Sequence, residues 1–274
     1  MTTSIDPVDA SKERVRSLFG TNVREWAAMY ATDTPRDWSA QDLLMRRRFA
    51  LEMIEQSVPK GARIADLGCG TGDMSAELIR RSYDVWGLDI AAQMIDYVRA
   101  RFGSEQFIVG DVEHIDFADD TFDAVVCLGV LEYLERDGAA LREIWRVLRP
   151  GGTAIISTPN ALCVFHHTDR LIETAASVLR PPYHAIRRMR GKPRLDRTRR
   201  PRVTHRRYFL TRWLATLSDA RLAPDAWVRH SWGWYTLAPY FGQTSLCRAS
   251  ERFARNRLVN WIGNTQIVRA TAIK

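Results

Sequence analysis

Short apolar runs alternate with amphipathic stretches between residues 62 and 157. Apolar runs of strand length, bounded by turn residues, are typical of buried strands, and the stretches between them carry the apolar spacing of helices. The predicted strands are Ala62–Leu67, Asp84–Leu88, Gln106–Val109, Ala124–Leu128 and Thr153–Ile156. The predicted helices are Met74–Arg81, Ala92–Arg101 and Gly138–Leu148, the last ended by Arg149-Pro150-Gly151-Gly152. Strands and helices that alternate in this way indicate a doubly wound α/β sheet.

The pattern changes on both sides of this region, so we divide the chain into four parts. Residues 1–58 are expected to form an N-terminal helical lid, with helices at Lys12–Tyr30 and Gln41–Val58. Residues 59–158 are the α/β core that would bind a cofactor, and residues 159–207 are a basic insertion or cap. Residues 208–274 complete the sheet and face an acceptor, with a helix at Tyr208–Ser218 and strands at Ala226–His230 and Gln266–Ile273.

Composition fits a single folded α/β protein. The chain has 274 residues, of which 46% are hydrophobic and 26% charged, ordinary values for a globular domain with an insertion. No apolar run approaches the roughly 20 residues that cross a bilayer. The first residues mix acids and bases without a continuous apolar core, so no secretory signal is predicted. We expect a cytoplasmic protein with reduced thiols at its four scattered cysteines.

Positive charge is concentrated in one segment. The net charge is +8, but residues 180–207 contain twelve Lys or Arg and one acid, a local balance of +11, so the remainder sums to −3. The preceding stretch, Ala161–Leu179, has the spacing of an amphipathic helix. An apolar helix face followed by cations is suited to an anionic membrane surface, which makes residues 161–207 a candidate peripheral membrane contact. The alternatives are a solvated loop over the active site and, less favoured because the remainder is acidic, nucleic-acid binding.

The most informative stretch is ARIADLGCGTGDMS, which reads as a strand, a glycine-rich turn and a helix. Its G-x-G-x-G spacing differs from the G-x-G-x-x-G that places a pyrophosphate at a helix N-terminus, and Asp66 would repel a diphosphate. S-adenosylmethionine has no phosphate and carries an ammonium and a sulfonium, which a carboxylate favours. Asp89 ends the second strand, where it can accept ribose hydroxyls, and Asp111 ends the third, where it can meet the adenine amino group.

On these motifs the chain resembles the class I S-adenosylmethionine-dependent methyltransferases, in the methyltransferase type 11 group that includes enzymes of ubiquinone and menaquinone synthesis. The resemblance spans Ile64–Ser157 and rests on ADLGCGTG, GLDIAAQM, GDVEHIDFADDTFDAVVCLGVLEYL and LREIWRVLRPGGTAIISTPN. It implies a Rossmann-like seven-stranded sheet whose final strand is antiparallel, with N-terminal helices and a helical insertion after the fifth strand. It also implies S-adenosyl-L-methionine as cofactor.

The resemblance assigns roles around that cofactor. The glycines would line its methionine side, Asp89 would hold the ribose, Met94 and Ile90 would sandwich the adenine, and Asp111 with Val112 would read the adenine edge. The end of the fourth strand would pass beneath the cofactor. The predicted cofactor-binding residues are Asp66, Gly68, Cys69, Gly70, Gly72, Asp89, Ile90, Met94, Asp111, Val112, Glu113, Leu128 and Gly129.

The chemistry of the acceptor depends on a proton. A phenol or alcohol is methylated more readily beside a general base, and the candidates are Glu132 and Tyr133 after the fourth strand and His205 before a late helix. His166 and His167 are further candidates. The chain also resembles the O-methyltransferases of ubiquinone synthesis, but Gly129 and Tyr133 stand where those enzymes have groups linked to a divalent metal. No metal site is therefore predicted.

The favoured hypothesis is O-methylation of a small hydrophobic, phenolic, quinone-like or lipid-linked hydroxyl compound. Aromatic residues between the last two strands would suit such an acceptor. Three alternatives stay open: N- or C-methylation of a small metabolite or sugar, RNA methylation through the basic segment, and a non-catalytic protein that binds S-adenosylmethionine. The acceptor, the methylated atom and the oligomeric state are not predicted.

Overall fold

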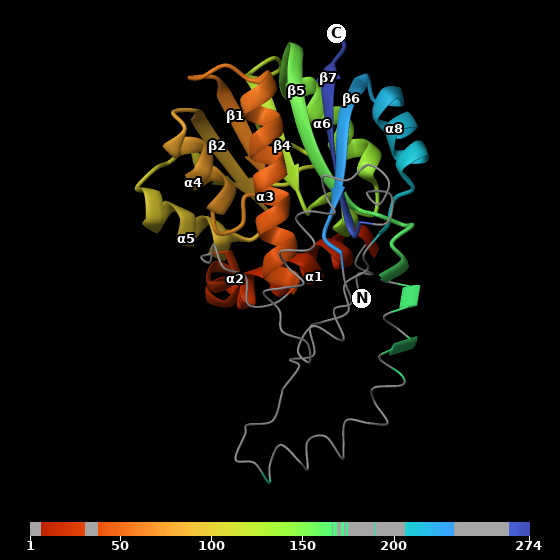
Figure 1. Ribbon diagram of the computed structural model, residues 1–274. Coiled ribbons are helices and arrows are strands. Elements are labelled where there is room, and N and C mark those ends of the chain that lie inside the picture. Colours follow the sequence, from red (N-terminus) through yellow and green to blue (C-terminus); the bar gives the residue numbers. More distant parts are fainter. Residues whose placement is uncertain are drawn as a thin grey trace, which may run out of the picture.

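The computed structural model describes residues 7–30, 38–165, 167–168, 171–172, 174, 189, 206–232 and 263–274. It contains one seven-stranded sheet in the order β3-β2-β1-β4-β5-β7-β6 (Figure 1). The first five strands pair in parallel, and β7 pairs antiparallel with both β5 and β6. The predicted sheet with a final antiparallel strand is confirmed. The strands are β1 (Arg63–Leu67), β2 (Asp84–Asp89), β3 (Phe107–Val109), β4 (Phe122–Leu128), β5 (Leu148–Pro159), β6 (Leu222–His230) and β7 (Thr265–Ala272).

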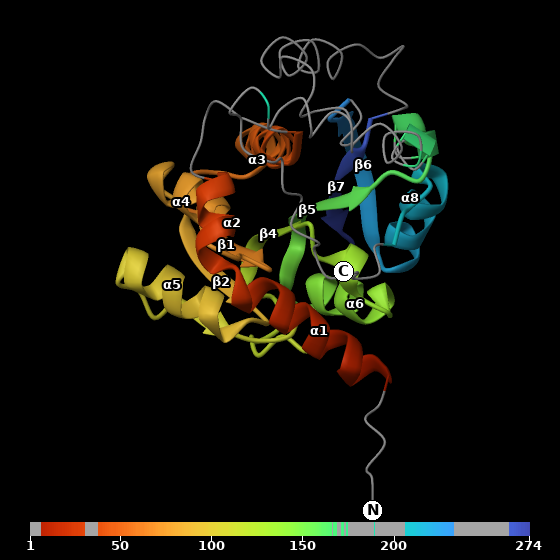
Figure 2. The ribbon, with the colours of Figure 1, turned by 90° about the horizontal axis from the view of Figure 1, so that it is seen from below.

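Helices cover both faces of the sheet (Figure 2). Apolar side chains of α3 (Trp38–Ser57) and α4 (Asp73–Arg80) pack on one face, and those of α6 (Asp137–Val147) and α8 (Leu210–Asp219) pack on the other. Strands buried on both faces read as continuous apolar runs, which is why the sequence pattern located them. Further helices are α1 (Pro7–Thr21), α2 (Val23–Tyr30), α5 (Ala92–Phe102) and the 3₁₀ turn η1 (Leu131–Tyr133). Described residues after β5, at 164–165, 167–168, 171–172 and 174, are also helical.

The predicted strand Ala226–His230 begins four residues too late, since β6 starts at Leu222, and two other predicted elements differ in kind. The first predicted helix, Lys12–Tyr30, is two helices that meet at Asn22. The predicted turn at Arg149-Pro150-Gly151-Gly152 is instead the beginning of β5, because Leu148 pairs with Phe122 directly after α6 ends. A register shift between Phe122 and Ala124, together with the left-handed φ of 74° at Gly151, admits the proline and glycines into the strand.

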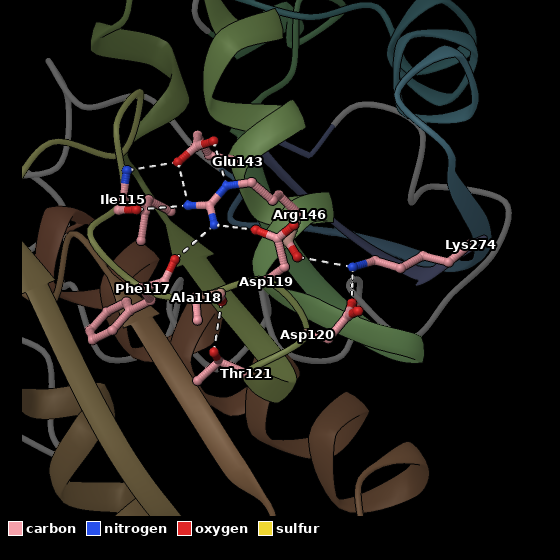
Figure 3. A network of polar contacts seen from close by, with 9 residues as sticks. All are labelled: Ile115, Phe117, Ala118, Asp119, Asp120, Thr121, Glu143, Arg146 and Lys274. Carbon is pink, nitrogen blue, oxygen red and sulfur yellow. Dashed lines mark hydrogen bonds and ion pairs between the residues drawn. The ribbon is translucent and has the colours of Figure 1, made fainter.

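Arg146 of α6 ties the loop between β3 and β4 to the helix (Figure 3). Its guanidinium donates to the backbone carbonyls of Ile115 and Phe117, each at 2.7 Å. The same group pairs with Glu143 at 2.8 Å and with Asp119 at 2.7 Å. These contacts fix the segment that leads into β4, and β4 carries the functional site at its carboxyl end.

Candidate functional site

A pocket opens at the carboxyl ends of β1 and β4, beside α3. It contains about 410 Å³ of space, including space open to solvent. The carboxyl ends of parallel strands are the usual ligand-binding edge of an α/β sheet. Its lining is rich in charged groups and in the glycine-rich turn after β1, and consists of Tyr30, Leu43, Arg46, Arg47, Asp66, Gly68, Cys69, Thr71, Asp73, Met74 and Leu128.

Asp66 is the buried acid of this pocket, only 3% exposed. Ser75 donates its hydroxyl to the carboxylate at 2.6 Å. Burial raises the pKa of Asp66 to about 6, and the nearby charges of Asp89 and Asp73 add to the rise. The group is therefore ionised at neutral pH at some cost in free energy, and a cation in the pocket would offset that cost.

The glycine-rich turn needs glycine at Gly68. Its φ is 73°, and an added Cβ would lie 2.2 Å from Cγ2 of Val130. Asp89 holds the same turn from β2, because its carboxylate accepts from the backbone N–H groups of Gly70 and Ala91, both at 2.9 Å. Asp66 and Asp89 thus flank one loop. The structure brings these two predicted residues together, although Asp89 is not part of the pocket lining.

The third predicted acid, Asp111, lies under α1. Lys12 of α1 pairs with Asp111 at 2.5 Å and with Glu113 at 2.6 Å. Both carboxylates belong to the predicted adenine-reading segment, so α1 covers that end of the site. Nothing in the sequence around Lys12 distinguishes it from a surface lysine, and its role was not predicted.

The predicted adenine-contacting residues divide by burial. Met94 is inside the protein and Val112 is buried, whereas Ile90 is half-buried. Gly72 has a left-handed φ of 76° and packs against Val98 and Phe102 of α5, which closes the turn against that helix. Contact of these residues with an adenine stays a prediction.

Glu132 lies at the start of the segment that follows β4 and is 4% exposed. Burial raises its pKa, and one carboxylate oxygen, Oε2, has no hydrogen-bond partner among the described residues. Its neighbour Gly129 has a φ of 73° and faces Arg46, since an added Cβ would lie 2.2 Å from Nη1 of that arginine and 3.6 Å from Oε1 of Glu132. Glu132 therefore stands next to the pocket at the end of β4.

Of the other catalytic candidates, Tyr133 and His167 lie within the described residues. Tyr133 packs edge-on against Phe19 of α1, with ring centroids 5.3 Å apart. His167 contacts the carbonyl of Ala161 at 2.8 Å, a local helix contact. His205 and His166, like most of the basic segment, lie outside the described residues.

Several charged pocket residues were not predicted. Arg46 pairs with Asp42 at 2.7 Å on the buried face of α3. Burial lowers the pKa of Arg46, but the carboxylates of Asp42 and Glu132 outweigh it and raise the pKa above its ordinary value. Two oppositely charged residues four apart on a helix usually indicate a solvated surface pair, so the sequence carried no signal that these two are buried.

Further features concern metals, membranes and thiols. Among the described residues, no three His, Cys, Asp or Glu side chains are grouped so that they could hold a metal ion. Within the same residues, no helix has the length and apolar character needed to span a bilayer. Cys69 and Cys127 are buried thiols without a disulfide, and burial raises the pKa of Cys69.

The seven-stranded sheet and the glycine-rich turn at its strand ends are similar to those of methyltransferases. Residues 65–156 match the family model described as a methyltransferase domain. A malonyl-[acyl-carrier protein] O-methyltransferase of Yersinia pestis is 38% identical over 98 residues, which cover 36% of this chain and 37% of that protein. The ubiquinone/menaquinone biosynthesis C-methyltransferase UbiE of Geotalea daltonii is 33% identical over 133 residues, 44% of this chain and 55% of that protein.

The structural comparison extends over nearly the whole chain. Magnesium protoporphyrin IX methyltransferase of Synechocystis PCC 6803, solved with bound S-adenosylhomocysteine, superimposes with a TM-score of 0.60 at 14% identity. That match covers 94% of this chain and 98% of the other, and it supports the fold alone. The sequence matches with the two curated relatives span only about a third to a half of those proteins.

Proposed function

We propose that the chain is an S-adenosylmethionine-dependent methyltransferase that methylates a hydroxyl oxygen of a small hydrophobic, phenolic, quinone-like or lipid-linked acceptor. One observation carries the proposal. A buried acid, Asp66, and two arginines line the pocket at the strand ends, and the buried carboxyl of Glu132 stands beside that pocket.

The pocket's charges suit the amino-acid end of S-adenosylmethionine, which has an ammonium and a carboxylate. Asp66 would bind the ammonium, and Arg46 or Arg47 would bind the carboxylate. Gly68 leaves room for close approach, and Asp89 would receive the ribose hydroxyls at the next strand end. When bound, S-adenosylmethionine supplies an electrophilic methyl group on its sulfonium sulfur.

Glu132 would act as the general base. A hydroxyl acceptor loses a proton as it is methylated, and a carboxyl whose pKa is raised by burial holds that proton better than an exposed one. Its oxygen Oε2 is the one that would receive the proton, because it has no partner among the described residues. Arg46, close to Gly129 and paired with Asp42, would keep the ionised form of Glu132 accessible.

Contact with an anionic membrane surface through residues 161–207 belongs to the same proposal. Four apolar side chains of the described part of this segment are exposed to solvent: Leu162, Val164, Leu171 and Met189. Exposed apolar residues next to a polybasic run are what an interfacial segment requires. Sedimentation with vesicles of phosphatidylserine and phosphatidylcholine, against vesicles of phosphatidylcholine alone, tests it.

The test of the central proposal begins with calorimetry of S-adenosylmethionine and S-adenosylhomocysteine. Asp89→Ala is expected to abolish binding, while the exposed Asp96→Ala on α5 serves as a matched control. Mass spectrometry of metabolites and lipids incubated with the enzyme and a labelled methyl donor then identifies the acceptor. A protein that binds neither compound contradicts the proposal, and one that binds both but labels nothing in the pool is a non-catalytic binding protein.

A further inference from the structure

A second polar cluster adjoins the pocket behind Arg46. It lies between the buried face of α3, the end of β6 and the start of β7. Its members are Asp42, His230, Ser231 and Thr265. All four are buried, and His230 is 0% exposed. The cluster is continuous with the cofactor pocket, because Arg46 lines the pocket and pairs with Asp42.

Hydrogen bonds in this cluster fix the tautomer of His230. Asp42 accepts from Thr265 Oγ1 at 2.8 Å, and the Ser231 hydroxyl also hydrogen-bonds Asp42. A serine that donates to a carboxylate presents a lone pair to its other neighbour, Nδ1 of His230 at 2.8 Å. Asp42 lies on the same side of the ring, 3.7 Å from Nδ1. The proton therefore belongs on Nδ1, and Nε2 carries a lone pair.

That lone pair has no partner among the described residues, although it is fully buried. Burial lowers the pKa of His230 to about 4, so the ring is neutral at physiological pH. A buried acceptor without a donor is unfavourable, and Oε2 of Glu132 is likewise buried without a partner among the described residues. Ser231 also has a φ of 64°, which is uncommon for a residue other than glycine.

We propose that Nε2 of His230 and Oε2 of Glu132 each accept a hydrogen bond from the methyl acceptor, which is therefore a compound with two separated hydroxyl groups. Asp42 and Ser231 are positioning residues that hold the proton of the imidazole on Nδ1 and leave the lone pair on Nε2. This inference rests on the proposed methyltransferase function and narrows its substrate. A carboxylate or a ketone brings only lone pairs to these two positions and would be rejected.

The separation of the two groups sets the size of the acceptor. Glu132 follows β4 and His230 ends β6, and β5 and β7 lie between them in the sheet. Three strand spacings of about 4.8 Å put the two strand ends roughly 14 Å apart, a distance that the side chains shorten. Hydroxyls at opposite ends of a fused or longer molecule can reach two positions on strands that are this far apart. Phe49, stacked on His230 with centroids 5.7 Å apart, offers such a molecule an apolar wall.

The test uses the full chain saturated with S-adenosylhomocysteine and three matched probes: 2,6-dihydroxynaphthalene, its dimethyl ether, and naphthalene-2,6-dicarboxylate. We expect the dihydroxy compound to bind at least tenfold more tightly than the other two. In protein labelled with ¹⁵N-histidine, the His230 resonances should show a protonated Nδ1 and a bare Nε2, and the dihydroxy compound should shift Nε2. Equal binding of the three probes, preference for the dicarboxylate, no binding, or a proton on Nε2 would each overturn the inference.

Two variants complete the test. His230→Phe keeps a ring beside Phe49 and should lower the affinity for the dihydroxy probe to that of the dimethyl ether. Asp42→Asn should weaken the same binding, because the proton of His230 is then no longer held on Nδ1. Trp227→Phe on the exposed side of β6 is the control. Calorimetry of S-adenosylhomocysteine separates the two proposals. If His230→Phe binds the cofactor and the dihydroxy probe as the wild type does, only this inference is contradicted. If the wild type does not bind the cofactor, the proposed function is contradicted.

Discussion

Lys12 and Asp111 are 99 residues apart in the chain and form an ion pair of 2.5 Å. The same ammonium meets Glu113, so one lysine of α1 joins two carboxylates of the segment predicted to read adenine. Burial lowers the pKa of Lys12, and the two carboxylates outweigh it and raise the pKa, so the charge persists at any physiological pH. The N-terminal helix is thus attached electrostatically to the segment that is predicted to contact adenine.

We expect Lys12→Met to release S-adenosylhomocysteine about three- to tenfold faster, because α1 loses its polar attachment over the bound adenosyl group. Stopped-flow displacement measures this rate. Arg16→Met is the matched control, since Arg16 lies on the same helix and pairs only with the exposed Glu13 among the described acids. Equal dissociation rates in the wild type and Lys12→Met would show that α1 does not retain the cofactor.

Asp66→Asn should separate stability from cofactor binding. A carboxyl whose folded pKa is raised to about 6 binds its proton more tightly in the folded state, so its contribution to stability falls as pH rises from 3.8 towards 6 and stays low above that. The amide can still accept from Ser75. At pH 7.5 we expect Asp66→Asn to raise the free energy of unfolding by about 1–3 kcal/mol, from a shift of about two pKa units.

The same substitution should weaken the binding of S-adenosylmethionine at least tenfold, because the amide offers no charge to the ammonium. For the wild type, affinity should decline as pH falls below about 6, where Asp66 takes up its proton. Urea denaturation and calorimetry at pH 5 and 7.5 check both parts. A variant less stable than the wild type at pH 7.5, or one with unchanged affinity, contradicts this account.

Much of the fold could be predicted because parallel strands are buried along their whole length and the helices between them are amphipathic. The glycine-rich turn could also be found, since it lies within one strand-turn-helix unit that has a local signature, and Asp89 could be found as the acid that ends the next strand. Lys12, Asp42 and His230 could not. Each has a partner far away in the chain, 223 residues in the case of Asp42 and Thr265. No local pattern distinguishes a buried lysine, aspartate or histidine from an exposed one.

Gly129→Ala tests the shape of the pocket. The new methyl group would lie 2.2 Å from Nη1 of Arg46 at a residue with a left-handed φ of 73°, so either the backbone or the arginine must move. We expect at least a tenfold loss of cofactor affinity with a modest loss of stability. Gly151→Ala is the control, because Gly151 has a similar φ of 74° and open space around it. Equal effects of the two substitutions would assign the loss to backbone strain alone.

Arg146→Met should destabilise the fold without altering the pocket directly. The substitution removes two hydrogen bonds to backbone carbonyls and leaves Glu143 without its closest cation (Figure 3). Hydrogen bonds to charged groups contribute about 1.5–3 kcal/mol each in favourable settings, and solvent reduces that value here because Arg146 is partly exposed. We expect a loss of about 1–3 kcal/mol in urea denaturation, and almost none for the exposed Arg142→Met on the same helix.

Glu132→Gln tests whether Glu132 takes the proton from the hydroxyl of the acceptor. The amide keeps the shape of the side chain and removes its basicity, so turnover of the acceptor identified by labelled-methyl mass spectrometry should fall by about 10²–10⁴, with the affinity for S-adenosylmethionine unchanged.

In the wild type, the rate should rise with pH through the raised pKa of Glu132, because only the ionised carboxylate can take the proton. The charge of Asp42 raises that pKa further, whereas the charges of Arg46 and Arg207 lower it. Glu132→Asp, which keeps the charge but shortens the reach, should retain more activity than the glutamine variant. A glutamine variant with full turnover would mean that the acceptor reaches the site already ionised, as a carboxylate does, and that Glu132 only completes the ion pairs around Arg46.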